Sequence, residues 1–298
     1  MLLVVAILVV SCKTNKSLTD NKELENALLW KIEGNDLSTP SYLYGTIHMI
    51  DAKDYFLPEG TLAAIDASEK MVFEIDMNEM NDMSKIMGIM SQAFMADNLS
   101  LEDLISEEDY KLVDEHFQEV GLPLAMLKRL KPMFLTVFAS SDMDPNGLQM
   151  GSLKSYEMEF AEMANDANME TGGLETIEFQ MGVFDEIPYE AQAEMLVEAI
   201  KNADAGTDEF DVMTELYLTQ NINGMVTMIG DEDKELAKYE DILLHKRNRA
   251  WIPQMATMMK EGPVFFAVGA GHLGGPIGVI TLLKNEGYKL TPISNVKN

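Results

Sequence analysis

The chain has 298 residues, of which 47% are hydrophobic, so it can bury a large core in one domain or in one domain with an insert. Its 22 basic and 50 acidic residues give a formal net charge of −28, which argues against nucleic acid or an anionic membrane surface as the main partner. A solvated acidic surface accounts for this charge, and a cationic substrate is compatible with it.

The first residues have the pattern of a lipid-anchored secreted protein. Residues 2–10 are uninterruptedly apolar, which is too short to span a bilayer but typical of a signal peptide, although no basic residue precedes them. Val9-Val10-Ser11-Cys12 resembles a bacterial lipoprotein box, in which cleavage precedes the cysteine and its thiol is acylated. We therefore expect a signal peptide at 1–11, lipidation of Cys12, a polar tether over 12–26 and one domain from 27 to 298. The predicted location is the cell envelope, periplasmic or outer-surface, with the membrane contacted only through the lipid.

Two apolar segments, 28–32 and 41–44, flank a turn cluster and predict a β-hairpin. The second segment runs into Gly45-Thr46-Ile47-His48, which places Gly45 and His48 at the carboxyl end of a strand. After a helix predicted over 58–68, residues 71–76 form a short apolar strand that Glu74 interrupts. A carboxylate there must be paired, hydrogen-bonded or metal-bound, and both a site role and a structural ion pair fit.

A helical insert or cap is predicted from about 78 to 168. Within it His116 lies among acidic residues, and we expect it to be solvated. One stripe of methionines recurs at three- and four-residue steps and favours a buried helix face over the lining of a permissive binding groove; its members are Met80, Met83, Met87 and Met90.

A brief strand signal returns in Gly172-Gly173-Leu174-Glu175. The glycine pair can bring backbone close to a ligand, with Glu175 beside it; alternatively Glu175 favours the start of the next helix. In the helix predicted over 232–251, Arg247 is centred on an apolar face and so needs a carboxylate or a ligand anion. Glu74 and Glu175 are its candidate partners, as a functional or a structural ion pair.

A second strand that ends in glycine and histidine lies near the carboxyl terminus of the chain. Residues 264–268 predict a strand buried on both faces, followed by Gly269-Ala270-Gly271-His272 and a helix from about 276. Open α/β sheets bind ligands beyond the carboxyl ends of their strands, so we expect His48 and His272 to converge on one site. Gly45, Gly269 and Glu175 are expected to lie against the substrate.

These motifs together resemble the TraB/GumN (pheromone-shutdown, Tiki-like) family. The resemblance covers the chain from about Leu29 to its end and rests on 42–48, 72–76, 173–180, Arg247-Asn248 and 268–273. It implies an α/β fold with a central β-sheet flanked by helices and a large helical insert, similar to the erythromycin-esterase and haem-lipoprotein folds. It also implies a metal-dependent peptidase activity with His48, His272, Glu74 and Arg247 as the active residues.

The leading hypothesis is a hydrolase, a peptidase in particular, in which His48 and His272 hold a divalent ion with Glu74 as a further ligand or as general base. Manganese, cobalt and zinc all suit such ligands. Arg247 would stabilise the oxyanion or anchor a substrate carboxylate, and the partner is a peptide or a small molecule. The alternatives are a metal-independent, esterase-like hydrolase, a non-catalytic lipoprotein that binds haem or a peptide, and a lipoprotein in which these groups only stabilise the fold.

Overall fold

The structure is a computed structural model that describes residues 23–81, 83–139, 147–204, 209–231 and 235–293. The expected signal peptide, Cys12 and most of the expected tether lie outside these residues. Leu24, near the end of that tether, is docked: the side chain of Asn223 accepts from its N–H at 3.3 Å and donates to its carbonyl at 2.7 Å. No helix in the described part of the chain is long and apolar enough to cross a membrane.

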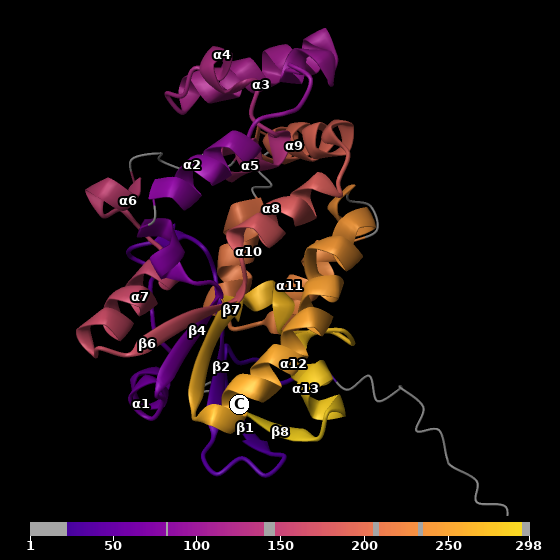
Figure 1. Cartoon of the computed structure of the whole chain (residues 1–298). Coiled ribbons are helices and arrows are strands. Elements are labelled where there is room, and N and C mark those ends of the chain that lie inside the picture. The colour runs from indigo at the N-terminus through magenta and orange to yellow at the C-terminus, as the bar shows by residue number, and fades with distance from the viewer. Residues whose placement is uncertain (1–22, 82, 140–146, 205–208, 232–234, 294–298) are drawn as a thin grey trace, which may run out of the picture.

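The described chain contains strands and helices, with long helical stretches between β4 and β5 and between β6 and β7 (Figure 1). The strands are β1 (Leu29–Gly34), β2 (Ser41–Thr46), β3 (Ile50–Asp51), β4 (Lys70–Ile75), β5 (Leu153–Lys154), β6 (Glu170–Glu175), β7 (Val264–Gly269) and β8 (Tyr288–Ile293). The α-helices are α1 (Thr61–Asp66), α2 (Met83–Gln92), α3 (Glu107–Glu119), α4 (Leu124–Leu127), α5 (Pro132–Leu135), α6 (Gly147–Met150), α7 (Tyr156–Asp166), α8 (Ile177–Asp185), α9 (Tyr189–Asp204), α10 (Glu209–Leu218), α11 (Ile222–Ile229), α12 (Lys246–Glu261) and α13 (Val279–Asn285).

One mostly parallel sheet organises the fold. Within the described residues its strand order is β6-β4-β7-β2-β1-β8, and β3 pairs with β5 separately. Strands β6, β4, β7 and β2 are parallel to one another, whereas β1 runs antiparallel to both β2 and β8. The predicted hairpin is therefore confirmed as β1–β2. The carboxyl ends of four neighbouring parallel strands meet at a single edge of the sheet.

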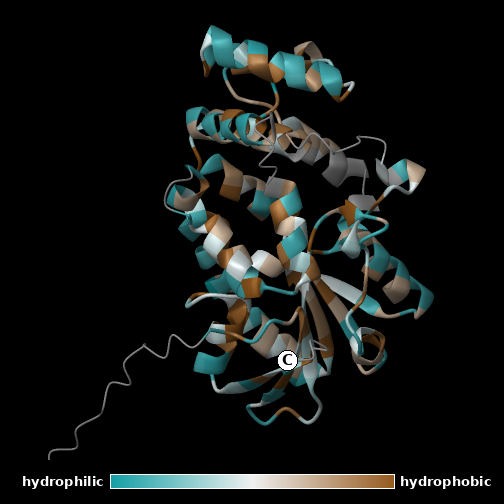
Figure 2. Cartoon of the chain, turned by 180° about the vertical axis from the view of Figure 1, so that it is seen from behind, coloured by the Kyte–Doolittle hydropathy of each residue, from teal (hydrophilic) through white to brown (hydrophobic). Residues whose placement is uncertain are grey.

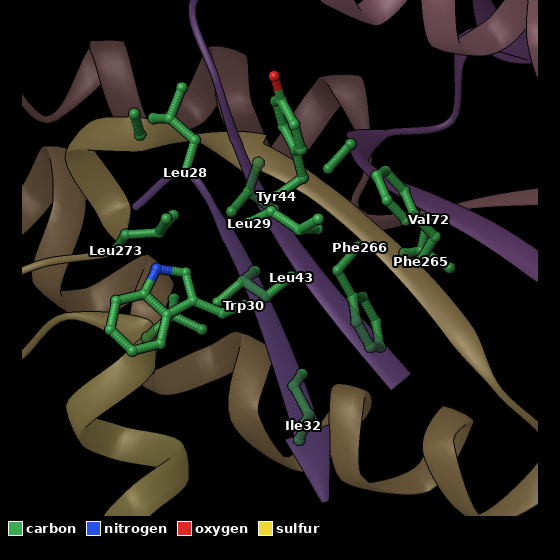
Figure 3. Packing of buried hydrophobic residues seen from close by; sticks show 14 of the residues in the cluster. Leu28, Leu29, Trp30, Ile32, Leu43, Tyr44, Val72, Phe265, Phe266 and Leu273 are labelled. Atoms are coloured by element: carbon green, nitrogen blue, oxygen red, sulfur yellow. The ribbon is translucent and has the colours of Figure 1, made fainter. Parts of the chain in front are cut away.

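Helices cover both faces of this sheet, as expected for an α/β protein. On one face Phe265 of β7 packs against Phe160 of α7, with ring centroids 5.4 Å apart. Side chains alternate along a strand, so Phe266 points to the opposite face. Its register row includes Leu43 and Trp30, and the amine of Lys284 of α13 lies over the ring of Trp30. Figure 3 shows Phe265, Phe266 and Trp30 in the buried hydrophobic cluster. Both faces of the sheet are thus covered by packed side chains, while its carboxyl edge lies between the two helical layers.

The helical layer has a hydrophobic core of its own. Most of its buried side chains come from α3, α4, α5 and α9, among them Val113, Phe117, Leu135 and Leu196. The layer therefore draws on α9, which lies beyond residue 168, while α7 packs against the sheet instead. Figure 1 places α3 and α4 at the end of the molecule far from the sheet, and Figure 2 shows α3 as largely hydrophilic on its outer side.

Two predictions for this layer are wrong. Met87 and Met90 of α2 are 66% and 59% exposed, and neither belongs to a buried cluster; the side chains of Met80 and Met83 lie outside what the structure describes. His116 is buried rather than solvated, and its Nε2 lies 2.9 Å from the carbonyl oxygen of Phe138. The acidic residues near His116 in the sequence lie on other faces of α3. Closeness in sequence alone does not show which face of a helix a residue occupies.

Candidate active site at the carboxyl edge of the sheet

Strand register brings the sequence motifs to one edge. Thr46 at the end of β2 lies opposite Gly269 at the end of β7, and Ile75 of β4 lies opposite Glu175 of β6. Glu74 and Glu175 are thus on neighbouring strand ends. Each histidine follows its own strand by two or three residues, so His48 and His272 are delivered to the same edge.

Arg247 is the hub of the buried part of the site. Its Nε donates to Glu175 at 2.9 Å, and its Nη2 donates to Glu74 at 2.5 Å and to Glu175 at 2.9 Å. Its Nη1 donates to the carbonyl of Leu243 at 3.0 Å and lies 3.2 Å from Nε2 of His272. A guanidinium has five N–H groups, and here each has an acceptor. Arg247 therefore has no donor left for an oxyanion or a substrate carboxylate, which differs from the role predicted for it.

A wide helical turn sets the position of Arg247. Residues Asp241–His245 form one π-helical turn directly before α12. Single π-helical turns are frequent at functional sites. Here the carbonyl of Leu243 accepts from Arg247 itself, which holds the guanidinium against the end of the sheet. The sequence predicted one helix over 232–251 and missed this interruption.

Glu74 is held as a carboxylate by three kinds of donor. Its Oε1 accepts from the backbone N–H of Gly269 at 2.8 Å, and its Oε2 accepts from Arg247 and from Gln180, the latter at 3.3 Å. Burial alone would raise the pKa of Glu74, but attraction to His272 when it is protonated, to Arg247 and to His48 lowers the pKa to about 2. Its side chain is 12% exposed, so the ionised group is largely shielded from solvent.

Glu175 is a structural partner within the network. Its side chain is 3% exposed, and Oε1 accepts from Nε1 of Trp251 at 2.7 Å in addition to its bonds from Arg247. This carboxylate is thus closed to substrate, contrary to the expectation that Glu175 lies against it. Arg247 thus bonds to both of the partners predicted for it, Glu74 and Glu175.

His272 is buried and neutral. The amide nitrogen of Asn248 donates to the carbonyl of Ile277 at 2.9 Å, so its Oδ1 is an acceptor and Nδ1 of His272, 2.6 Å away, carries the proton. The unprotonated Nε2 faces Arg247 and lies 3.8 Å from Oε1 of Glu74. Burial, together with the charge of Arg247 and against the attraction of Glu74, lowers the pKa of His272 to about 3. The ring of Trp251 lies 4.4 Å away and completes the enclosure.

His48 lies on the outer side of the site. Its side chain is 77% exposed, and Nδ1 lies 3.2 Å from Oε1 of Glu157. The hydrogen bond to Glu157, opposed by partial desolvation, raises the pKa of His48 to about 9. His48 and Glu74 are near enough for each charge to shift the pKa of the other, although no direct contact joins them.

The two motif glycines, Gly45 and Gly269, have different surroundings and different roles. A Cβ on Gly269 would lie 3.1 Å from Oε1 of Glu74, so the absence of a side chain lets the carboxylate reach the strand end. Gly45 is buried, and both of its backbone groups are used, since its N–H donates to Leu28 and its carbonyl accepts from the hydroxyl of Tyr217. A Cβ there would lie 2.9 Å from Leu273. Gly45 is a packing residue and does not line the site as predicted.

The three predicted metal ligands are not assembled around one point. Among the described residues no group of three or more His, Cys, Asp or Glu side chains is placed to hold a metal ion. Arg247 occupies Nε2 of His272 and one oxygen of Glu74, and His48 is turned toward Glu157. In this arrangement the residues His48, His272 and Glu74 do not fit a three-ligand metal site.

Several site residues were not predicted as such. Three of them contact His272, Glu175 and Glu74, respectively: Asn248, Trp251 and Gln180. In the sequence these three stand out only as members of an apolar stripe or of a family motif. Glu157 comes from α7, in a helical stretch with many glutamates. No pattern in the sequence distinguishes Glu157 from its neighbours.

The fold and this cluster define an α/β protein whose polar site lies beyond the carboxyl ends of parallel strands, where such sheets bind ligands. The chain belongs to the TraB/PrgY/gumN family, whose family model matches residues 28–292. The resemblance predicted from its motifs is thereby confirmed.

The chain is also similar to animal proteins named metalloproteases. It is 22% identical over 330 residues to "Metalloprotease TIKI1" of Danio rerio, covering 94% of this chain and 65% of that protein. It is 22% identical to "Metalloprotease TIKI1" of Homo sapiens, covering 89% of this chain and 61% of that protein, and 21% identical to "Metalloprotease TIKI homolog" of Amphimedon queenslandica, covering 92% and 63%. The chain thus spans less than two thirds of the length of these relatives.

Proposed function

We propose that this chain is a hydrolase that cleaves peptide bonds at the carboxyl edge of its sheet. The observation that carries the proposal is the ionised Glu74, fixed by Gly269 and Arg247 beside the neutral His272 and within electrostatic reach of the exposed His48. The printed names of the relatives, metalloproteases, support a peptide as substrate.

Each residue has a role that its surroundings allow. Glu74 has accepting capacity beyond its three donors and can orient a water molecule toward a scissile carbonyl. His48 is the group that exchanges protons with solvent and substrate, because its ring is exposed while that of His272 is enclosed. Arg247 keeps Glu74 ionised and in place, and Glu175 and Trp251 keep Arg247 in place. His272 accepts a hydrogen bond from Arg247 through Nε2 and so also helps to hold the guanidinium in place.

Peptide hydrolysis by the Glu74→Gln variant tests this proposal. The amide keeps the size of the side chain but removes its charge, and we expect turnover of an unstructured peptide pool to fall by about 10²–10⁴-fold. Mass spectrometry of the products measures the effect, and circular dichroism verifies folding. Glu170→Gln, on an exposed glutamate of the same sheet, is the control and should retain full activity. Equal hydrolysis by wild type and Glu74→Gln would overturn the assignment.

A divalent metal is the second part of the proposal, and the names of the relatives support it. His48, His272 and Glu74 are the candidate ligands, and manganese, cobalt or zinc suits their atoms. The described arrangement does not assemble them, so no step is assigned to a metal. Elemental analysis of wild type and His272→Ala, with activity measured after chelation, decides the matter. Bound metal that is lost with His272 supports it, whereas activity that persists after chelation and is unchanged by added ions favours the metal-independent hydrolase.

We also propose that the protein is tethered in the cell envelope through a lipid on Cys12. The apolar run at 2–10 and the sequence before Cys12 support this location. Cys12→Ala should move the protein from the membrane fraction to the soluble fraction after cell disruption. Unchanged membrane association of that variant would contradict the proposal.

A further inference from the structure

The two motif histidines are held in different ways, and the partner of His48 has no assigned role. His272 is bonded to Asn248 inside the buried cluster, whereas His48 contacts the carboxylate of Glu157 at the end of another helix. We propose that Glu157 is a positioning residue that orients the imidazole of His48 and presents its Nε2 to the substrate. This inference rests on the proposed function only in assigning the substrate contact to His48.

The carboxylate of Glu157 is itself fixed. Its Oε1 accepts from the hydroxyl of Thr46 at 2.8 Å as well as facing His48, and its Oε2 accepts from the hydroxyl of Ser155 at 3.0 Å. The Glu157 side chain is 17% exposed and the His48 side chain 77% exposed. The fixed, mostly buried carboxylate of Glu157 thus contacts one edge of the His48 ring, and the rest of that ring is exposed to water.

The helix that carries Glu157 is anchored to the strand that precedes His48. Tyr156, the neighbour of Glu157, lies 6.0 Å from the ring of Tyr44 on β2, and its hydroxyl donates to the carbonyl of Phe56 at 2.7 Å. Phe160, one turn further along α7, packs edge-on against Tyr44 at 5.0 Å. The core contact between α7 and β2 therefore sets the distance between Glu157 and the residues that follow β2.

The chemistry of the pair determines which nitrogen of His48 is available. An ionised carboxylate only accepts hydrogen bonds, so Nδ1 of His48 must donate to it. In the neutral ring this leaves the lone pair on Nε2, and in the protonated ring it leaves the Nε2 proton as the one that can be given away. A carboxylate behind an imidazole is a common device for fixing the tautomer and orientation of a catalytic or ligating histidine. Glu157 supplies that device here.

NMR of protein labelled with ¹⁵N in histidine tests the orientation without any assay of activity. The chain has four histidines, and comparison with His48→Gln assigns the ring of His48. In the wild type we expect a slowly exchanging Nδ1–H correlation from His48. Glu157→Ala should abolish it, whereas Glu157→Gln, which keeps an accepting oxygen, should retain it. The ring signals of His272 should be the same in all forms, and Glu162→Ala, on an exposed glutamate of the same helix, should change nothing. An Nδ1–H signal that survives in Glu157→Ala would overturn the proposal.

Kinetics then separates this proposal from the proposed function. We expect Glu157→Ala to lower kcat by roughly 10- to 100-fold with KM unchanged, and Glu157→Gln to recover part of the loss. If the wild type hydrolyses no peptide but the NMR result holds, the peptidase assignment fails and the orientation of His48 by Glu157 stands. If hydrolysis needs His48 but Glu157→Ala has wild-type kcat, the positioning role fails and the peptidase assignment stands.

Discussion

The two sides of the site differ in how firmly they are held. On the inner side Glu74, Glu175, Arg247 and His272 form a buried network in which every N–H of the guanidinium has an acceptor. On the outer side His48 has one partner among the described residues, Glu157, and its side chain is largely exposed.

This difference separates stability from chemistry. Removing one member of a buried ion pair leaves the other charged and unpaired, so the inner side should dominate the free energy of unfolding. An exposed imidazole with a single partner adds little to stability but remains able to meet a substrate. The buried network around Arg247 is thus expected to stabilise the site, and the pair of His48 and Glu157 is the part that a substrate would reach first.

The largest effect is expected for Glu175→Ala. It leaves Nε of Arg247 and the indole N–H of Trp251 without their carboxylate, and we expect a loss of about 3–5 kcal/mol in the free energy of unfolding. Urea denaturation measures it. Glu170→Ala removes a glutamate of the same strand whose ion pair with Lys70 is exposed, and it should cost no more than about 1 kcal/mol. Equal losses for the two variants would break the comparison.

A smaller loss is expected for Gly45→Ala, the glycine that precedes the outer histidine. The new methyl group would lie 2.9 Å from Leu273 and 3.1 Å from the Cα of Ala270, and overpacking of this kind costs about 1–3 kcal/mol. Thermal unfolding detects it. Gly182→Ala is the matched control because nothing lies within 4 Å of that position in α8, so it should be neutral or stabilising by about 0.5–1 kcal/mol. A Gly45→Ala variant as stable as the wild type would contradict the packing role.

The pH dependence of stability should have opposite signs on the two sides. The pKa of His272 is about 3 when folded and 6.5 as a free side chain, so the unfolded chain binds more protons between these values. Stability from His272 is therefore complete above pH 6.5 and is lost as the pH falls toward 3, by at most about 1.4 kcal/mol per pH unit. Glu74 adds a loss in the same direction between pH 4.5 and about 2.

His48, whose pKa is raised to about 9, contributes stability that is present below pH 6.5 and lost as the pH rises through 9. Solvent around the ring keeps this contribution small. Urea denaturation at several pH values, with His272→Asn and His48→Asn as paired variants, measures both. A steeper acid loss in His272→Asn than in the wild type would refute the sign given for the inner histidine.

The smallest effect on stability is expected for His48→Gln. Its side chain is largely exposed, so the free energy of unfolding should stay within about 0.5 kcal/mol of the wild type. Turnover of the peptide pool, by contrast, should fall as it does in Glu74→Gln. A variant that unfolds much more easily but keeps its turnover would reverse the roles given to the two sides.

Much of the inner network was within reach of the sequence. A helical wheel places Arg247 on an apolar face, and an arginine there needs carboxylates, which Glu74 and Glu175 supply. Parallel strands end at one edge, so two strands that close in Gly-x-x-His bring their histidines to it. These are local patterns whose physical consequence does not depend on the details of packing.

The outer side and the loops were beyond that reach. Glu157 meets His48 only because α7 packs on β2, and the sequence contains no periodicity that states this contact. One acceptor of Arg247, the carbonyl of Leu243, lies in a π-helical turn, and a helical wheel assumes a regular helix. Gly45 and Gly269 occupy equivalent motif positions, but their neighbours give one a packing role and the other a place beside Glu74.

The docking of Leu24 on Asn223 has a consequence for the proposed lipid anchor. If Cys12 carries a lipid, the span from the lipid to this docking point is limited to the residues between Cys12 and Leu24, because both backbone groups of Leu24 are bonded to Asn223. At 3.3–3.6 Å per residue, that span is at most roughly 43 Å. An anchored protein of this kind would then meet its substrates close to the membrane surface.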